Sequence, residues 1–246
     1  MYSRSHLENI LFLDIETASS TAVYADLPER LQGLWDKKAA LLNKREETPI
    51  PPDELYEQRA AIFAEFGKVV CISCGYIKYV EDRPTFRLKS WYGDDEVKIL
   101  QDFAGMLDKF MERPGRNLCA HNGKEFDFPY MGRRYLIRGL PLPQALADIQ
   151  MKKPWEIRLI DTMTLWKFGD FKNFTSLDLL CAVLDVPTPK DDIDGSMVGH
   201  VFWVEKDPKR IAVYCEKDVL ATANVLLRMC QEPLVAEADV AYSVEG

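Results

Sequence analysis

Asp14 and Glu16 are the first residues in the chain whose types and spacing could do chemistry. They end a short apolar run, Ile10–Asp14, that predicts a buried strand. In extended backbone, two residues separated by one other point to the same face. Two carboxylates ending a buried strand are strongly disfavoured unless a cation meets them, so the pair favours a metal site. Alone the signal is weak, because Asp-x-Glu is common by chance and recurs at Asp94–Glu96, where we expect an exposed helix start.

Asp127 lies in a second polar segment, between a predicted strand at Asn117–Ala120 and a predicted helix over Phe128–Arg138. An acid in this position can simply cap the helix by accepting hydrogen bonds from its first backbone N–H groups. An ordinary cap does not need the histidine and asparagine that precede it, His121 and Asn122, or the aromatic residues around it. We therefore interpret Asp127 as a candidate functional acid.

Tyr214 and Asp218 form the third feature, in the last long predicted helix. At positions i and i+4 the two side chains share one face of that helix. Their neighbours on this face are residues expected to pack on a sheet, such as Ile211, Cys215 and Val225. An unpaired acid on a packed face is strongly disfavoured, so Asp218 requires a partner, either a basic side chain or a metal ion.

Hydrophobic periodicity predicts the elements that must position these residues. Strands are predicted from β-branched and aromatic stretches, and helices from apolar residues at three- and four-residue spacing. The predicted strands are Ile10–Asp14, Lys68–Tyr79, Thr85–Trp91, Asn117–Ala120 and Ile157–Ile160. The predicted helices are Asp94–Glu112, Phe128–Arg138, Leu177–Leu184 and one from Asp207 to about Gln231, and Pro187–His200 is expected to be a loop.

Two further helices are predicted between the first two strands. The proline-rich stretch Thr48–Pro52 breaks the first of them, and Asp53 is expected to cap the second, which stops at Gly67. We interpret residues 22–66 as a helical hairpin inserted in a single domain that covers 1–246. Its predicted fold class is α/β, a mixed sheet of three adjacent antiparallel strands plus parallel strands, flanked by helices.

Composition and charge exclude several classes of protein. Hydrophobic residues are 47% of the 246, which is enough for a sizeable core and excludes wholesale disorder. The apolar runs are too short to cross a bilayer, and no signal peptide is expected. Six cysteines are too few for a disulfide scaffold and favour a reducing, cytoplasmic location. The net charge of −8 argues against binding nucleic acid by bulk positive charge, but it allows acids gathered in one site and neutralised by metal ions.

The order and local contexts of the four acids and the tyrosine resemble the DEDDy 3′–5′ exonucleases of the ribonuclease H-like superfamily. The resemblance is carried by Phe12-Leu-Asp-Ile-Glu-Thr17, Asn122-Gly-Lys-Glu-Phe-Asp127 and Tyr214-Cys-Glu-Lys-Asp218. It spans about Leu11 to Leu226. Within that group the chain is similar to predicted exonucleases related to the proofreading domain of family B DNA polymerases. Its stretches Ser176–Leu180 and Lys190–Ser196 also resemble that group. The hairpin departs from the minimal nuclease fold.

This resemblance implies a ribonuclease H-like fold and hydrolysis of a phosphodiester bond that releases nucleoside 5′-monophosphates. Two divalent cations roughly 3.5–4 Å apart can serve both ends of an in-line displacement, and oxygen ligands suit Mg²⁺ or Mn²⁺. Asp14 is expected to bridge both ions, Glu16 and Asp218 to complete the nucleophile-side ion, and Asp127 to hold the leaving-group ion. Tyr214 is expected to orient the attacking water. Without metal, carboxylates this close are expected to raise one another's pKa.

Residues around the three motifs are expected to contact the substrate, namely Thr17, Asn122, Phe126 and Arg133. Phe126 crowds the Asp127 motif together with Phe128 and Tyr130 and could stack on a terminal base, although core packing is expected for at least two of the three rings. Basic side chains nearby either contact phosphates or form ordinary solvated surfaces: Arg134, Arg138, Lys152, Lys153, Lys167 and Lys172.

Several other residues have plainer interpretations. Cys71 and Cys74 lie within one predicted strand and are expected to be buried structural cysteines, since no second pair follows at zinc-site spacing. His121 is expected to support the Asp127 loop, because the position of the catalytic histidine in sister exonucleases holds a tyrosine here. Asp161 is interpreted as a helix cap or a group behind the ligands, and His200 as a loop residue without an obvious partner.

The substrate is predicted to be a single-stranded 3′ end. DNA is favoured over RNA only because the resemblance is to a DNA proofreading domain. Because the 246 residues are not expected to include a polymerase domain, any proofreading or DNA repair role is expected to act alone or through a partner. One alternative is an exoribonuclease with the same site. The other is a non-catalytic nucleic-acid-binding subunit that docks on a protein partner through the hairpin at 22–66.

Overall fold

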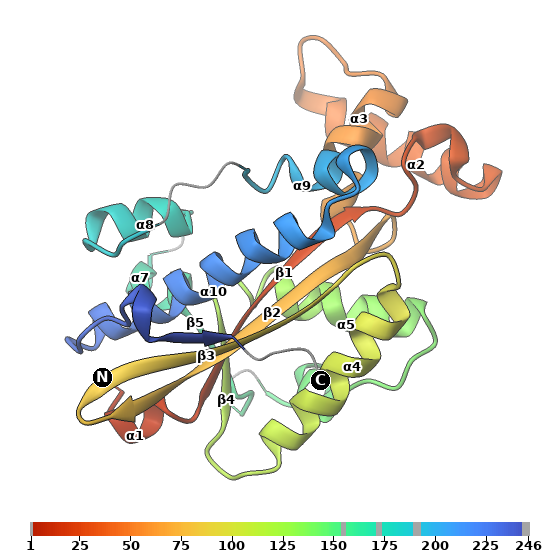
Figure 1. Cartoon of the computed structure of the whole chain (residues 1–246). Coiled ribbons are helices and arrows are strands. Elements are labelled where there is room, and N and C mark those ends of the chain that lie inside the picture. The colour runs from red at the N-terminus through yellow and green to blue at the C-terminus, as the bar shows by residue number, and fades with distance from the viewer. Residues whose placement is uncertain (1, 154–155, 171–173, 189–192, 243–246) are drawn as a thin grey trace.

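The first strand is the frame on which the rest of the molecule is built. The computed structural model describes residues 2–153, 156–170, 174–188 and 193–242, and in it β1 (Ile10–Ser19) crosses the middle of the sheet (Figure 1). The strand is twice as long as the predicted Ile10–Asp14, because Ile15 and Ala18 continue its burial and its pairing runs on to Ser19. Asp14 and Glu16 therefore lie inside the strand and not at its end.

The strands of the described residues form one mixed sheet in the order β5-β4-β1-β2-β3-β6. β1, β2 and β3 pair antiparallel, whereas the pairs β1–β4, β4–β5 and β3–β6 are parallel. This confirms the predicted mixed sheet and adds β6, a strand too short to give a sequence signal. The strands besides β1 are β2 (Gly67–Val80), β3 (Arg83–Tyr92), β4 (Asn117–Ala120), β5 (Leu159–Asp161) and β6 (Val240–Tyr242).

Helices cover both faces of the sheet. The long helix α10 crosses β1, β2 and β3 on one face, and α4 and α5 pack on the other (Figure 1). The helices outside the hairpin are α1 (Arg4–Leu7), α4 (Glu96–Met111), α5 (Asp127–Ile137), α6 (Gln144–Met151), α7 (Thr162–Lys167), α8 (Leu177–Val183), α9 (Val198–His200) and α10 (Pro208–Met229), with the π-helical η4 (Val201–Glu205) and the 3-10 turn η5 (Glu237–Asp239). None of the helices described is long and apolar enough to span a membrane.

The two faces of β1 carry different neighbours. Leu11, Leu13 and Ile15 belong to the apolar cluster under α4 and α5. Ile10 and Phe12 join the cluster under the C-terminal half of α10, and Ala18 joins the one near its N-terminus. Asp14 and Glu16 alternate with the same period as Ile10, Phe12 and Ala18, so they lie on the same face of β1 and interrupt its apolar row directly beneath α10. The strand therefore carries both carboxylates into a packed interface.

The predicted hairpin is present as a helical excursion between β1 and β2. It consists of η1 (Tyr24–Asp26), α2 (Glu29–Leu42), η2 (Asn43–Arg45), α3 (Pro52–Arg59) and η3 (Ala60–Ile62). Its own small core is built around Trp35, whose ring meets those of Tyr56 and Phe66 at 5.3 and 5.0 Å. A separate core of this kind allows the hairpin to be an insertion that leaves the sheet intact.

Two predicted boundaries within the hairpin are wrong. Asp53 does not cap α3, because Pro52 takes the first helical position, where its fixed φ is favourable, and Pro51 precedes it. The helix ends at Arg59, and Gly67 is the first residue of β2. Glycine is required there by close approach, since a Cβ atom would lie 2.2 Å from the Tyr130 hydroxyl and 2.8 Å from the Ala61 carbonyl oxygen.

The stretch Pro187–His200, which was expected to be a loop, ends in the helical turn α9. His200 is paired there, with its Nε2 3.7 Å from Glu205 Oε1, so the expectation that it lacks a partner is wrong. Part of the stretch, including Lys190, lies outside the described residues, as does Lys172.

Candidate active site

Asp14 and Glu16 reach the site from β1, beside an irregularity in its pairing with β2. Glu16 pairs with Cys71, but the next residue, Thr17, pairs with Val69, so Val70 is an extra residue on β2. Val70 and Cys71 consequently both pack on the α10 side of the sheet. Such β-bulges are over-represented next to active sites, where they re-aim side chains.

Asp127 comes to the same point from the N-terminus of α5. It is the first residue of that helix, and the residue is only 3% exposed. Its Oδ1 accepts a hydrogen bond of 3.2 Å from the backbone N–H of Ile15, the residue between the two acids of β1. The carboxylate thus ties α5 to the centre of the sheet, in addition to lying at a helix N-terminus.

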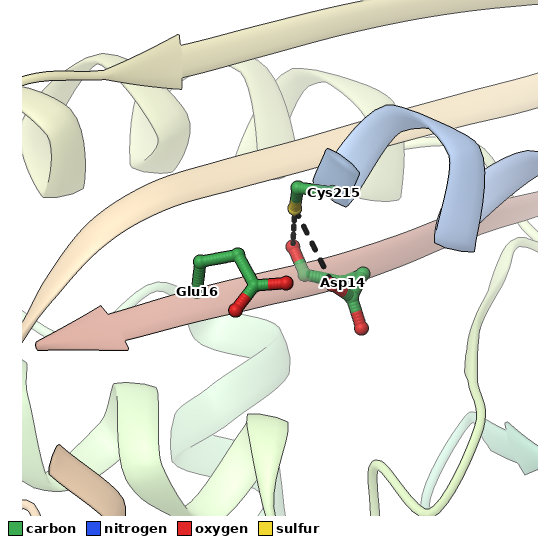
Figure 2. Close-up of side chains that lie close together, drawn as sticks. All are labelled: Asp14, Glu16 and Cys215. Atoms are coloured by element: carbon green, nitrogen blue, oxygen red, sulfur yellow. Dashed lines mark hydrogen bonds between the residues drawn. The ribbon is translucent and has the colours of Figure 1, made fainter. Parts of the chain in front are cut away.

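The third contribution comes from α10, which begins with Pro208 after an Asp207 cap that accepts from the Arg210 backbone N–H at 3.0 Å. The Tyr214 hydroxyl is hydrogen-bonded to the carboxylate of Asp218, one turn further along. Between them, the Cys215 thiol donates to Asp14, with Sγ 3.3 Å from Oδ2 and 3.4 Å from the backbone oxygen (Figure 2). α10 therefore closes over the acids of β1.

The electrostatics of the cluster are dominated by burial and by the mutual repulsion of closely packed carboxylates. Burial raises the pKa of Asp14 and of Glu16 well above the ordinary value, and the charges of neighbouring carboxylates raise both further. Burial likewise raises the pKa of Asp127 to about 7, against the opposing effect of two backbone hydrogen bonds. The expectation that these acids raise one another's pKa is confirmed for the structure as described.

The donor set fits a divalent cation. One oxygen each of Asp14 and Glu16 and the Sγ atom of Cys215 lie within 4.8 Å of one another. The charges of Asp127 and Asp218 are close enough to act on Asp14. A cation placed among these groups would attract each carboxylate and so oppose the burial and repulsion that raise their pKa values.

A second set of polar residues holds the Asp127 loop. Asp161 caps α7 by accepting from the Thr164 N–H at 3.0 Å, and it also accepts from the N–H groups of Asn122 and Lys124. This confirms its interpretation as a helix cap. His121 bonds Thr162 Oγ1 and the Thr175 carbonyl oxygen, both at 2.9 Å, and so supports the loop as predicted. Burial lowers its pKa, which keeps the ring neutral.

The four residues assigned to substrate lie in different settings. Thr17 is 8% exposed and is hydrogen-bonded to the hydroxyl of Tyr130. Asn122 has a left-handed φ of 62°, and its Oδ1 is buried without a hydrogen-bond partner among the residues described. Phe126 is half-buried with its ring 5.3 Å from that of Tyr130, and Arg133 is exposed on α5. Phe128 and Tyr130 are core residues, at 1% exposure each.

Two of the basic residues considered for phosphate contacts have another role. The Arg134 guanidinium binds Glu96 through two hydrogen bonds of 2.8 and 2.7 Å, and its side chain is 3% exposed. Arg138 binds the same carboxylate at 2.5 Å. The expected exposed helix start at Asp94–Glu96 is confirmed for Asp94, which is exposed just before α4, but it is wrong for Glu96, which is 2% exposed with its charge balanced inside the protein. Lys152 is paired with Asp148 at 2.7 Å.

Sequence reasoning did not place Cys71 and Cys215 at the site. Cys71 and Cys74 are buried as predicted, but they pack on opposite faces of β2, and Cys71 lies on the face of the acids, where it is hydrogen-bonded to Cys215. The signal was available in the parity of β2. Once Glu16 is paired with Cys71, strand alternation places that thiol beside the carboxylates.

Comparison with known proteins identifies a family for most of the chain. Residues 62–238 match the model of a family described as "Predicted 3'-5' exonuclease related to the exonuclease domain of PolB". The matched range contains Asp127, Tyr214 and Asp218 and begins after Asp14 and Glu16. No curated protein matches the chain.

A solved structure similar to this chain is that of the family B DNA polymerase from the hyperthermophilic archaeon Pyrobaculum calidifontis. It aligns with a TM-score of 0.50 and 15% identity over 90% of this chain. The chain spans 24% of that polymerase, so the likeness concerns the fold, which is ribonuclease H-like. Because the family match covers well over half of its length, the chain belongs to the family of predicted 3′–5′ exonucleases related to the exonuclease domain of PolB.

Proposed function

We propose that the chain is a single-domain, metal-dependent 3′–5′ exonuclease that releases nucleoside 5′-monophosphates from single-stranded 3′ ends, with DNA preferred over RNA. Membership of an exonuclease family implies a nucleic acid substrate. The observation that carries the proposal is the convergence of Asp14, Glu16, Asp127, Tyr214 and Asp218, brought from β1, α5 and α10 into one acidic cluster.

The four carboxylates would hold two Mg²⁺ or Mn²⁺ ions, Asp14 being shared between them. Bound there, the ions would supply positive charge to the scissile phosphate and make water acidic enough to attack at neutral pH. The residues of the chain would then hold the carboxylates in position. The hydrogen bond from the Ile15 N–H holds Asp127, and the thiol of Cys215 holds Asp14.

Tyr214 would act by positioning the attacking water through its hydroxyl. Burial and the charge of Asp218 raise the pKa of Tyr214, so the phenol stays protonated at physiological pH and cannot serve as a base. Its hydrogen bond to Asp218 instead fixes the ring and the hydroxyl at the edge of the cluster. Orientation of this kind is a recognised source of rate enhancement.

The test is an assay with matched 5′-labelled single-stranded DNA and RNA oligomers in Mg²⁺, Mn²⁺ or EDTA. Asp14→Asn keeps the shape of the side chain and removes its charge, and we expect it to lower kcat by about 10³-fold or more. Asp178→Asn, which changes an exposed acid on α8, is the matched control and should leave the rate unchanged.

The pattern of products decides between the alternatives. A ladder that shortens from the 3′ end, requires metal and is lost in Asp14→Asn supports the exonuclease and reveals its sugar preference. Faster shortening of RNA would favour the exoribonuclease. If folded, metal-loaded protein binds the oligomers but shortens neither, the enzyme proposal is overturned in favour of a binding subunit.

A further inference from the structure

We infer that the outward face of α2, in the helical hairpin, binds a nucleic acid single strand upstream of the 3′ end that the acidic cluster would hold. This face, here called the α2 stripe, consists of Arg30, Leu34, Lys37, Leu41 and Lys44. The inference rests on the proposed function for the place of the 3′ end. It gives a role to the inserted hairpin, which the acidic cluster leaves unexplained.

The α2 stripe places three cations in a row. Arg30, Lys37 and Lys44 follow one another at intervals of about two helical turns, so the row is about 20 Å long. Lys44 belongs to the turn η2, which continues α2. All three residues are exposed, and no hydrogen bond or ion pair joins their side chains to another residue that the structure describes. An exposed row of unpaired cations favours a polyanionic partner.

The acids of α2 lie beside the row and not within it. Asp36 is about 120° around the helix from Arg30, and it accepts a hydrogen bond of 2.7 Å from the Tyr24 hydroxyl. Glu29, in the first turn, borders the shallow hollow between Arg30 and Lys37. The row is therefore positive in a chain whose net charge is −8.

Two exposed leucines alternate with the cations and favour a single strand as the occupant. Leu34 is 44% exposed and Leu41 is 69% exposed, each about one turn after a cation of the row. A single strand presents unstacked bases between its phosphates, so it can offer apolar surface to the leucines and charge to the cations. Lipid is a poorer match, because the broad apolar face that a membrane-bound helix needs is here buried in the hairpin core with Trp35 and Ala39.

The hairpin is fixed to both elements that carry the first three acids of the site. On β1, Ser19 lies three residues after Glu16, about 10 Å along an extended strand, and the hairpin follows it (Figure 1). On α5, the Tyr130 hydroxyl donates to the Ala61 carbonyl oxygen at 2.8 Å. A row of about 20 Å matches about six stacked nucleotides at 3.4 Å each. A strand that leaves the cluster thus meets a surface held in a constant position.

The experiment measures binding of labelled single-stranded DNA by fluorescence anisotropy in Mg²⁺. The full chain carries Asp14→Asn, so that the oligomer is not consumed. One variant in this background discharges the α2 stripe: Arg30→Gln, Lys37→Gln and Lys44→Gln. The matched control discharges three exposed cations toward the beginning of β1, at the opposite end of that strand from the hairpin: Arg83→Gln, Lys109→Gln and Arg113→Gln.

With an oligomer of about 20 nucleotides, discharging the α2 stripe should weaken binding at least about tenfold at low salt. The slope of log K against log salt should become shallower by about 2, which corresponds to about three lost phosphate contacts. With an oligomer of about 4 nucleotides, which spans only about 14 Å when stacked, the affinity should change less than about twofold. The control variant should bind both oligomers as the background does. Exchange of lysine and arginine at the three positions should also preserve binding, because it keeps the charge.

Equal affinities of the discharged and control variants, or an equal loss for both oligomer lengths, overturn the inference. Vesicles of phosphatidylserine and phosphatidylcholine test the lipid alternative. Vesicle binding that is lost with the α2 stripe while oligomer binding is unchanged overturns the inference in favour of a membrane surface.

The outcome is separable from that of the proposed function, because binding is measured without hydrolysis. Strand binding through the α2 stripe, with no shortening of the oligomer by the unaltered chain, would support the inference and overturn the proposed function. Shortening by the unaltered chain, with binding insensitive to the α2 stripe, would do the reverse.

Discussion

At the scale of single residues, the acids of the site are held under conditions that oppose their charge. Glu16 and Asp127 are buried and Asp14 is half-buried, and loss of hydration is the largest cause of the rise in each pKa. The backbone N–H of Ile15 and the thiol of Cys215 offset part of this for Asp127 and Asp14. The cluster as four anions therefore destabilises the folded chain, and a bound cation removes that destabilisation.

The first prediction is that the metal-free protein loses stability as pH rises. A carboxyl group whose pKa is higher in the folded than in the unfolded chain favours folding while it is protonated. Its contribution to the free energy of unfolding is complete at pH values below the unfolded pKa and is lost as the pH rises through the folded pKa. For Asp127 this window runs from about 4 to about 7. Thermal unfolding in EDTA should show Tm falling across this range, and saturating Mg²⁺ should abolish the fall.

Asp14→Asn provides the control for this prediction. It removes one of the interacting charges, so in EDTA at pH 8 its Tm should exceed that of the unaltered chain by about 2–4 °C per kcal/mol of repulsion relieved. An equal or lower Tm would contradict the electrostatic account of the cluster.

The second prediction concerns Tyr214→Phe, which keeps the ring and removes the hydroxyl bonded to Asp218. If the hydroxyl orients the attacking water, kcat falls by about 10²-fold, while KM and Tm stay nearly unchanged. Single-turnover assays measure the rate, and calorimetric titration with Mg²⁺ measures the metal affinity. A loss of metal affinity as large as the loss of rate would show that the hydroxyl serves the ligand Asp218 instead.

At the scale of elements, the placement of α5 depends on a buried ion pair far from the acids of the site. Glu96, at the start of α4, accepts from Arg134 on α5, from Arg138 just after that helix, and from the Val69 N–H of β2 at 2.7 Å. Arg134 lies seven residues after Asp127, which places both on one face of the helix about two turns apart. The pair therefore fixes the helix whose first residue enters the site.

The third prediction compares Arg134→Met with Arg138→Met. Arg134 is 3% exposed in its side chain, so removing its charge leaves Glu96 buried beside one partly exposed partner, and the free energy of unfolding should fall by about 3 kcal/mol. Arg138 is 39% exposed, and its loss should reduce the free energy of unfolding by no more than about 1 kcal/mol.

Urea unfolding measures the free energy of unfolding of both variants. The acid Glu96 has a lowered pKa because the hydrogen bonds and charge of Arg134, with Val69 and Arg138, outweigh its burial. Equal effects of the two substitutions would show that the buried pair does not dominate the placement of this helix.

At the scale of the whole molecule, charge decides how substrate is recruited. The net charge is −8, and several basic side chains that could contact phosphate are engaged within the protein, Arg134 and Arg138 with Glu96 and Lys152 with Asp148. These three cations are not free to displace counterions from a strand. Under the proposed function, we expect recognition to rest on the site and on bound metal more than on long-range attraction.

The fourth prediction is a shallow salt dependence of binding. With about three phosphate contacts, the slope of log K against log salt for a single strand is about −2. Fluorescence anisotropy of a labelled oligomer with the Asp14→Asn variant between low and physiological salt measures it. A slope steeper than about −4 would reveal a basic groove.

Much of the fold could be predicted from the sequence because its signals are local. Alternation and helical periodicity within a segment predicted β2 to β4, α4 and α10, since each must bury one face whatever its neighbours are. The two residues between β2 and β3, Glu81 and Asp82, both adopt positive φ, as a tight hairpin requires. Local signals did not reveal β6, because its pairing with β3 involves chain far away in sequence.

The candidate site divides in the same way. The types and order of Asp14, Glu16, Asp127, Tyr214 and Asp218 could be recognised in the sequence, because each acid or hydroxyl lies in a short motif. Only the tertiary structure decided that Glu96 is a buried partner of Arg134, and that the Cys215 thiol donates to Asp14 across 201 positions. Contacts of this kind depend on how a strand and a helix pack, and packing is not encoded in either segment alone.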